Sequence, residues 1–234
     1  MVPLSDENPT RTTPYIVYGF IILNILIFLH EISLSSRGLQ LFFDTWAIVP
    51  AQLTASFQGG LANPSPEWFT LISSQFLHGG FLHLGGNMLY LWIFGNNIED
   101  RLGPVKFVIF YLGCGILAGL SQWFFNPAST IPNVGASGAI AGVMGAYIIR
   151  FPKAQIVTLI PFLFYFFTMR IPAIFFLGFW FIQQAFYSIA SLGAQVEMGS
   201  GGVAYWAHAG GFVFGMILGP LLGIFSNDSP RRRY

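Results

Sequence analysis

Hydrophobic residues are concentrated in six long segments of the chain, each apolar enough to form a helix that crosses a lipid bilayer. These segments cover approximately residues 15–31, 80–98, 105–125, 137–149, 171–192 and 203–225. The pattern predicts an all-α membrane protein, a bundle of six transmembrane helices spanning residues 15–225. Residues 1–14 and 226–234 are then expected to form short cytoplasmic tails, the second of them basic.

One further apolar stretch, residues 154–169, contains Pro161 and is bounded by Lys153 and Arg170. If it crossed the bilayer, those two charges would lie on opposite sides. We therefore expect an interfacial or re-entrant connection here. The long connection from residue 33 to residue 78 is rich in tryptophan and phenylalanine, so part of it is expected to lie in the membrane interface.

The basic residues orient the predicted bundle. With six spans and both termini on one side, nine of the ten Lys and Arg residues share that side. They are Arg11, Arg101, Lys106, Arg150, Lys153, Arg170, Arg231, Arg232 and Arg233, and Arg37 is alone on the other side. Cytoplasmic loops carry the excess of basic residues, so both termini are predicted to be cytoplasmic. A seventh span at residues 154–169 would weaken this asymmetry.

The composition supports the lipid bilayer as the surrounding solvent. Only 8% of the residues are charged and 54% are hydrophobic, whereas soluble domains carry about 25% charged residues. The net charge of +1 provides no field for recruiting nucleic acid. A single cysteine, Cys114, and four histidines predict neither an internal disulfide nor a metal cluster, and no cofactor is expected. The short tails favour a bacterial plasma membrane.

Polar residues inside a membrane span are costly and are therefore candidates for function. They occur near the starts of the second, fourth and sixth spans, as His78, His83 and Asn87, as Ser137, and as His208. These three spans run in the same direction, from the outside inward, so their starts lie in one leaflet. The predicted topology therefore places the polar groups at one depth, in a site that opens to the outer side.

These residue types are suited to acyl transfer. A serine hydroxyl becomes a nucleophile when a neutral imidazole removes its proton, which gives Ser137 and His208 their predicted roles. Ser137 opens a helix, where backbone N–H groups favour a developing negative charge. His83 and Asn87 lie four residues apart on one helical face and could help to hold that oxyanion. Hydrogen bonding between helices is the alternative role for this pair. No carboxylate lies within a span away from its ends, so a Ser–His dyad is expected.

Small residues recur at four-residue intervals on the fourth and sixth spans. They are Gly138 and Gly142 on the fourth span and Gly211, Gly215 and Gly219 on the sixth. Such faces allow two helix backbones to approach closely in a membrane. Contact between these two spans would bring Ser137 to His208.

Four motifs together resemble the rhomboid family of intramembrane serine proteases, over nearly the whole chain. They are HGGFLHLGGN at residues 78–87, EDRLG at 99–103, GASG at 135–138 and AHAGG at 207–211. The resemblance implies a six-helix core that cleaves transmembrane segments of other proteins. It also implies Ser137 as nucleophile, His208 as base, and His83 and Asn87 as groups that stabilise the oxyanion.

The sequence departs from the family pattern at two places. The family often carries an aromatic residue four positions after the serine, against which the histidine ring packs, and here that position is Ala141. The Trp-Arg pair common in the first loop is replaced by Trp68-Phe69. His78 is expected to be loop-facing or structural, and Ser121 and Gln122 are expected to pack or to face the interface rather than to hold water.

The predicted function is hydrolysis of peptide bonds in transmembrane segments of membrane-protein substrates. A catalytically inactive relative that binds or chaperones membrane proteins is the alternative, against which the presence of both Ser137 and His208 argues. A small transporter or channel is a third class, but spans without carboxylates or charged pairs give an ion little to bind.

Overall fold

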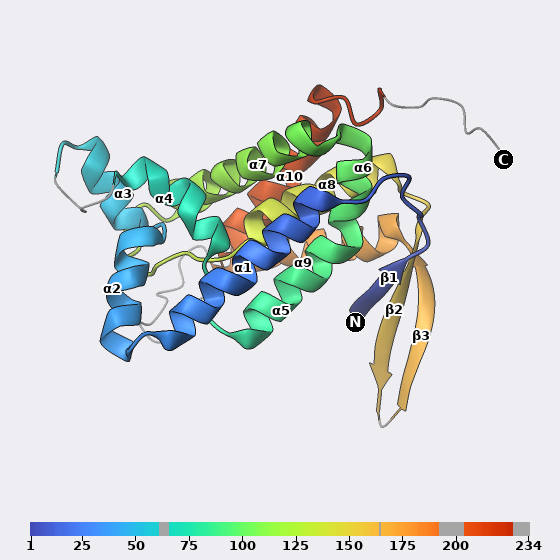
Figure 1. Ribbon diagram of the computed structural model, residues 1–234, viewed down its shortest axis with the longest axis horizontal. Coiled ribbons are helices and arrows are strands. Elements are labelled where there is room, and N and C mark those ends of the chain that lie inside the picture. Colours follow the sequence, from blue (N-terminus) through green and yellow to red (C-terminus); the bar gives the residue numbers. More distant parts are fainter. Residues whose placement is uncertain (61–65, 164, 192–203, 227–234) are drawn as a thin grey trace.

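The computed structural model describes residues 1–60, 66–163, 165–191 and 204–226, and most of them are helical (Figure 1). The helices are α1 (Tyr15–Ser33), α2 (Ser36–Trp46), α3 (Pro50–Phe57), α4 (Glu67–Ser73), α5 (Phe81–Tyr90), α6 (Asn96–Leu102), α7 (Pro104–Phe125), α8 (Ser137–Arg150), α9 (Ala173–Ala190) and α10 (Tyr205–Leu221). A 3₁₀ turn covers Ser74–Phe76, and one π-helical turn, Leu91–Gly95, joins α5 to α6. The strands are β1 (Val2–Asp6), β2 (Gln155–Phe162) and β3 (Tyr165–Pro172).

The predicted helical membrane bundle is confirmed, because the chain is mostly helical and several of its helices are apolar. Within the described residues, α1, α7 and α9 are each long and apolar enough to cross a membrane, and α8 is a shorter apolar helix. The predicted second span corresponds to α5, the π-helical turn and α6, which follow one another without a break. The number of six crossings stays a prediction.

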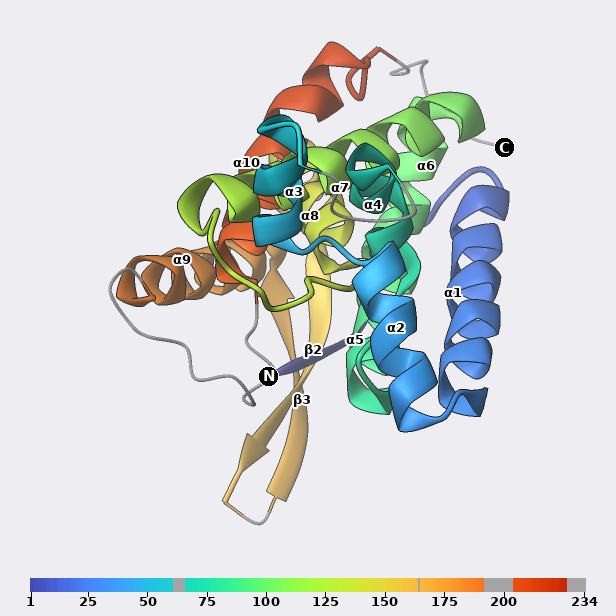
Figure 2. The ribbon, with the colours of Figure 1, turned by 90° about the vertical axis from the view of Figure 1, so that its left-hand side faces the viewer.

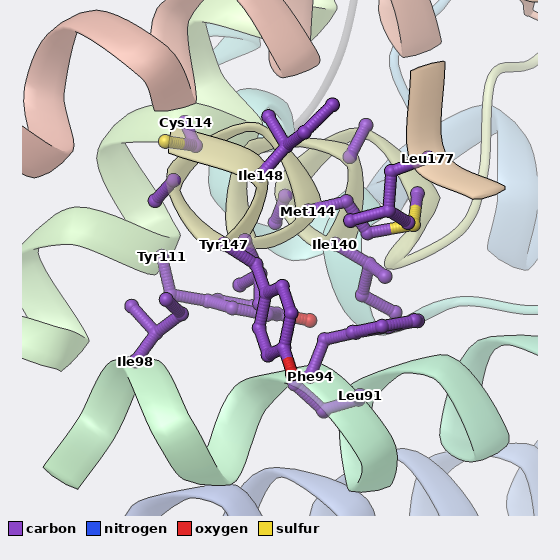
Figure 3. Packing of buried hydrophobic residues seen from close by; sticks show 14 of the residues in the cluster. Leu91, Phe94, Ile98, Tyr111, Cys114, Ile140, Met144, Tyr147, Ile148 and Leu177 are labelled. Carbon is purple, nitrogen blue, oxygen red and sulfur yellow. The ribbon is translucent and has the colours of Figure 1, made fainter. Parts of the chain in front are cut away.

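Helix α8 lies at the centre of the bundle. All of its residues from Gly138 to Ile148 are buried, although the helix is only 14 residues long. Figure 3 shows core side chains around α8, with Tyr147 directed toward Phe94 on the neighbouring π-helical turn. The two rings meet edge to face, with centroids 5.0 Å apart. A helix that is apolar on every side in this way is stabilised by packing against several neighbours.

Glycines bring α8 and α10 into backbone contact. A Cβ atom added to Gly211 would overlap the carbonyl oxygen of Gly138, and one added to Gly215 would overlap that of Gly142. The absent side chains are thus replaced by the backbone of the facing helix, as small residues permit in membrane bundles. This contact fixes the separation between the start of α8 and the start of α10.

A small antiparallel sheet, in the order β1-β2-β3, accompanies the helices. The stretch 154–169, expected to be an interfacial or re-entrant connection, forms most of the β2–β3 hairpin. Val2–Asp6, expected to be part of a tail, pairs with β2. Figures 1 and 2 both show the hairpin projecting from the helical body. The predicted tail at 226–234 lies outside the described residues apart from Ser226.

The N-terminus of α1 is held by two acidic residues of the EDRLG motif. The carboxylate of Glu99 accepts hydrogen bonds from the backbone N–H groups of Ile16 and Val17, at 3.0 and 2.9 Å. Asp100 accepts from the N–H groups of Arg11 and Thr12 just before the helix. Helix N-termini leave N–H groups without intrahelical partners, so these carboxylates supply the missing acceptors and tie α1 to α6.

The N-terminal strand is anchored through Asp6. Its carboxylate accepts a hydrogen bond of 2.6 Å from the hydroxyl of Tyr147. Burial raises the pKa of Asp6 to about 6, because removal from water disfavours the charged form, and the hydrogen bond from Tyr147 opposes this shift. Glu7, the next residue, forms an ion pair of 2.6 Å with Arg170 of β3.

Candidate active site

Ser137 is the first residue of α8 and is reached through a left-handed glycine. Gly135 has φ 126°, a conformation that residues with a Cβ atom rarely adopt. A Cβ atom at this position would also lie 2.7 Å from Nε2 of His83. Glycine therefore lets the chain pass directly beside His83 immediately before it turns into α8.

The side chains of Ser137 and His208 meet across the α8–α10 contact. The Oγ atom of Ser137 lies 2.8 Å from Nε2 of His208, which is hydrogen-bonding distance. The other ring nitrogen, Nδ1, lies 2.9 Å from Oε1 of Gln184 on α9. The hydroxyl, the imidazole and the amide thus form a continuous hydrogen-bonded row that joins three helices.

The His208 ring also packs against α9. Its centroid lies 5.9 Å from that of Trp180, with the two planes inclined by 38°. Ala141, at the position where the family often has an aromatic residue, is fully buried within the core. The sequence analysis predicts no role for Trp180 or Gln184. The feature that could have indicated them is an amide within an apolar span, four residues after a tryptophan.

His83 and Asn87 lie beside the start of α8. The backbone N–H of Gly79 donates to Nδ1 of His83 at 3.4 Å, so the ring can carry its proton on Nε2, the atom nearest to Gly135. The Nδ2 atom of Asn87 lies 3.0 Å from Nε2 of His78. His78 is buried, and its backbone N–H donates to the carboxylate of Glu31 at 3.2 Å. His78 thus holds Asn87, which favours the structural one of its two expected roles over the loop-facing one.

All four predicted site residues line one cavity of about 650 Å³. The apolar part of its wall comes from Leu82, Ile131, Pro132, Val134, Ile140, Met144 and Trp180. Ligand sites combine such apolar walls with a few polar groups that fix orientation. The four predicted residues contribute a hydroxyl, two imidazoles and an amide, and the polar side chains of Tyr90 and Asn133 also line the cavity. Within the residues that the structure describes, no group of three or more His, Cys, Asp or Glu side chains could hold a metal ion.

Ser121 and Gln122 lie near the end of α7 and are engaged in bonds with the protein. Ser121 donates to the carbonyl of Leu117 on its own helix at 2.8 Å. The side-chain oxygen of Gln122 accepts from the backbone N–H of Ala207 at 3.3 Å. Gln122 therefore contacts the residue that precedes His208 and helps to connect α7 to the start of α10.

Comparison with known proteins identifies the family of the chain. The family model described as "Rhomboid domain" matches residues 65–225. The chain belongs to the rhomboid family. The matched segment contains Ser137, His208, His83 and Asn87, and it begins after the first predicted span.

Several curated rhomboid proteins are similar in sequence. The chain is 34% identical over 154 residues to "Rhomboid protein 1, mitochondrial" of Saccharomyces cerevisiae, covering 64% of this chain and 40% of the yeast protein. It is 34% identical to "Putative rhomboid protease YdcA" of Bacillus subtilis, covering 50% of this chain and 53% of YdcA. It is also 35% identical to "Rhomboid protease GluP" of Bacillus subtilis, covering 57% of this chain and 24% of GluP. The similarity thus spans from about a quarter to about half of these relatives' lengths.

Proposed function

We propose that this rhomboid-family chain is an intramembrane serine endopeptidase that cleaves transmembrane segments of other membrane proteins. The hydrogen bond between Ser137 and His208 at the wall of the 650 Å³ cavity is the observation that carries the proposal. It gives a nucleophile and a base within reach of each other, which is the geometric requirement for covalent catalysis by serine. Two relatives that are named as proteases support the same activity.

In the acylation step, Oγ of Ser137 forms a bond with the carbonyl carbon of the scissile peptide. Nε2 of His208 takes the hydroxyl proton as that bond forms. The carbonyl oxygen becomes an oxyanion, for which His83 and Asn87 are the proposed donors beside the start of α8. When the C–N bond breaks, His208 returns the proton to the leaving amine, and the substrate's acyl group remains as an ester on Ser137.

Deacylation uses water as the second nucleophile. His208 removes a proton from the water while the water oxygen attacks the ester carbonyl. The ester bond then breaks, the released acyl group leaves as a carboxylic acid, and Ser137 regains its proton from His208. The same oxyanion donors serve both steps, because both pass through a tetrahedral intermediate.

The proposed substrate is a membrane helix that unwinds near the cavity. Its backbone must leave the helix before a carbonyl carbon can reach Ser137, and unpaired backbone groups are costly in lipid. Small or helix-breaking residues near the cleavage site lower that cost. The apolar wall residues of the cavity suit the side chains of such a segment. We further propose that both termini are cytoplasmic and that the cavity opens to the outer side.

The test uses detergent-purified protein, a fluorophosphonate probe and a model transmembrane substrate. Wild type is expected to be labelled and to cleave the substrate. Ser137→Ala should lose both activities because it lacks the nucleophile, and His208→Ala should lose nearly all cleavage because the hydroxyl keeps its proton. Ser56→Ala is the matched control. Ser56 lies on α3 and does not line the cavity.

Cleavage by Ser137→Ala at the wild-type rate would show that another group is the nucleophile. Absence of labelling and cleavage in folded wild type would favour the alternative function, a rhomboid-family protein that binds membrane proteins without hydrolysing them. The thermal stability of wild type and of each variant is measured on the same samples, so that a loss of activity is not confused with a loss of folding.

A further inference from the structure

We infer that Gln184 is a positioning residue for His208, and that α9 supplies through Gln184 and Trp180 the support that the family's aromatic residue on the fourth span would otherwise give. The inference rests on the proposed function, since His208 is its general base. It extends the expected Ser–His dyad to a Ser–His–Gln row. The three side chains come from α8, α10 and α9, so the arrangement exists only in the folded bundle.

The amide oxygen of Gln184 determines which ring nitrogen carries the proton. Oε1 is an acceptor only, and it lies 2.9 Å from Nδ1 of His208. A hydrogen bond between them requires a proton on Nδ1, which leaves Nε2 with its lone pair. Nε2 is the atom that lies 2.8 Å from Oγ of Ser137. The imidazole is thereby held in the tautomer that can accept the serine proton.

The position of Gln184 on α9 directs its side chain into the bundle, unlike that of the adjacent Gln183. Gln184 is 8% exposed, whereas its neighbour Gln183 is exposed on the surface of the helix. Burial of an amide in an apolar bundle is unfavourable unless the amide forms hydrogen bonds. The contact with His208 provides one, so the buried glutamine and the buried side of the imidazole satisfy each other.

Trp180 and Gln184 are four residues apart and therefore lie on the same face of α9. Trp180 lies 5.9 Å from the His208 ring and 6.0 Å from the ring of Phe212, one turn further along α10. Phe181 stacks on Phe212 with centroids 4.7 Å apart, which holds α9 against α10. With Ala141 too small to reach the imidazole from α8, the orientation of the ring depends on the packing of α9.

A neutral amide differs from the carboxylate of a catalytic triad in what it supplies. It orients the imidazole and selects the tautomer, but it adds no negative charge to stabilise the imidazolium. We therefore expect loss of Gln184 to have a smaller effect than the roughly 10⁴-fold loss known for a wrong tautomer in a serine protease triad, on the order of 10- to 100-fold in kcat.

The kinetic test compares three variants by the rate of fluorophosphonate labelling at Ser137 and by kcat and KM for a model substrate. Gln184→Leu removes the acceptor at similar size and should lower both the labelling rate and kcat by about 10- to 100-fold with little change in KM. Gln184→Glu keeps an oxygen acceptor at the same reach and should retain activity within about tenfold of wild type. Gln183→Leu, the exposed neighbour, should behave as wild type. A Gln184→Leu variant that is labelled as fast as wild type would overturn the inference.

A second measurement does not depend on activity. The measurement is ¹⁵N NMR of protein labelled with ¹⁵N-histidine. The chain has four histidines, and the signals of His208 are assigned as those that disappear in His208→Ala. At neutral pH the wild-type ring should carry its proton on Nδ1, and Gln184→Leu should show a mixture of tautomers. A wild-type ring protonated on Nε2 would contradict the inference. If wild type is not labelled by the fluorophosphonate at all, the proposed function fails, but the tautomer result still decides the role of Gln184.

Discussion

At the scale of single residues, Asn87 illustrates how one amide can have two tasks. One N–H of its Nδ2 group is directed to Nε2 of His78 at 3.0 Å, which leaves the second N–H for a ligand in the cavity that Asn87 lines. If that N–H stabilises the oxyanion, Asn87→Ala should lower kcat by about 10²- to 10³-fold, as loss of an oxyanion donor does elsewhere. KM should change little, since the interaction forms in the transition state. Steady-state kinetics on the model substrate measures both.

The control for Asn87 is His78→Ala. This change removes the same hydrogen bond from the other side, so both variants lose stability, but only Asn87→Ala also removes the proposed donor. We expect His78→Ala to keep a substantially higher kcat than Asn87→Ala. Equal losses of kcat in the two variants would mean that Asn87 acts by supporting the fold and not as a donor.

The site residues differ in how far they could be predicted from the sequence. Ser137 and His208 stand out because a hydroxyl and an imidazole near span starts are conspicuous among apolar residues, and the topology alone places them at one depth. Gln184 could not be selected in the same way. The sequence places two glutamines side by side, and only the packing of α9 shows that Gln184 is buried while Gln183 is exposed. Sequence spacing within one helix cannot show which side chain of a neighbouring helix will face it.

At the scale of elements, the contact between α8 and α10 controls the distance between Ser137 and His208. A Cβ atom on Gly215 would overlap the carbonyl oxygen of Gly142, and a backbone atom cannot move aside as a flexible side chain can. We expect Gly215→Ala to destabilise the protein by about 1–3 kcal/mol, as overpacking does, and to lower cleavage because the two helices separate. The apparent melting temperature and the cleavage rate measure the two effects.

Gly19→Ala is the matched control for Gly215→Ala. Gly19 lies within α1, and a Cβ atom there would meet nothing within 4 Å. Alanine favours a helix by about 1 kcal/mol over glycine, so this variant should be as stable as wild type or slightly more so. If Gly215→Ala is also as stable and as active as wild type, the close approach of α8 and α10 is not needed for the site.

The secondary-structure elements also show where the local pattern of apolar residues is not enough to predict the structure. The helices α1, α7, α8, α9 and α10 coincide with predicted spans, because a membrane span is defined by its own apolar run, whereas α2, α3 and α4 lie in the stretch 33–78 that was expected to be a connection. The β2–β3 hairpin was not predicted, although Ile156, Val157 and Phe167 belong to residue types that favour strands. A short apolar run is compatible with several structures, and here β2 pairs both with β3 and with Val2–Asp6, about 150 residues earlier in the chain. The pairing of β1 with β2 is long-range and leaves no local signature in the sequence.

At the scale of the whole molecule, the predicted orientation in the membrane can be tested at the two ends of α1. Its 19 residues extend about 28 Å, close to the roughly 30 Å thickness of a bilayer core. Thr13 precedes the helix and Ser36 follows it, and both are exposed. The single cysteine, Cys114, is buried, so a new cysteine at either position can be labelled against a silent background. If α1 crosses the bilayer as expected, these two positions report on opposite sides of the membrane.

If both termini are cytoplasmic, a membrane-impermeant maleimide should label Ser36→Cys in intact cells. Thr13→Cys should be labelled only after the membrane is permeabilised. The physical reason is the asymmetry of basic residues, since Arg11 and eight other basic residues are expected on the side of Thr13, with Arg37 alone on the other. The unsubstituted protein, probed in parallel, controls for Cys114. The reverse pattern of labelling would place the cavity of Ser137 and His208 on the cytoplasmic side, and the substrate segments proposed for cleavage would then have to enter from the inner leaflet.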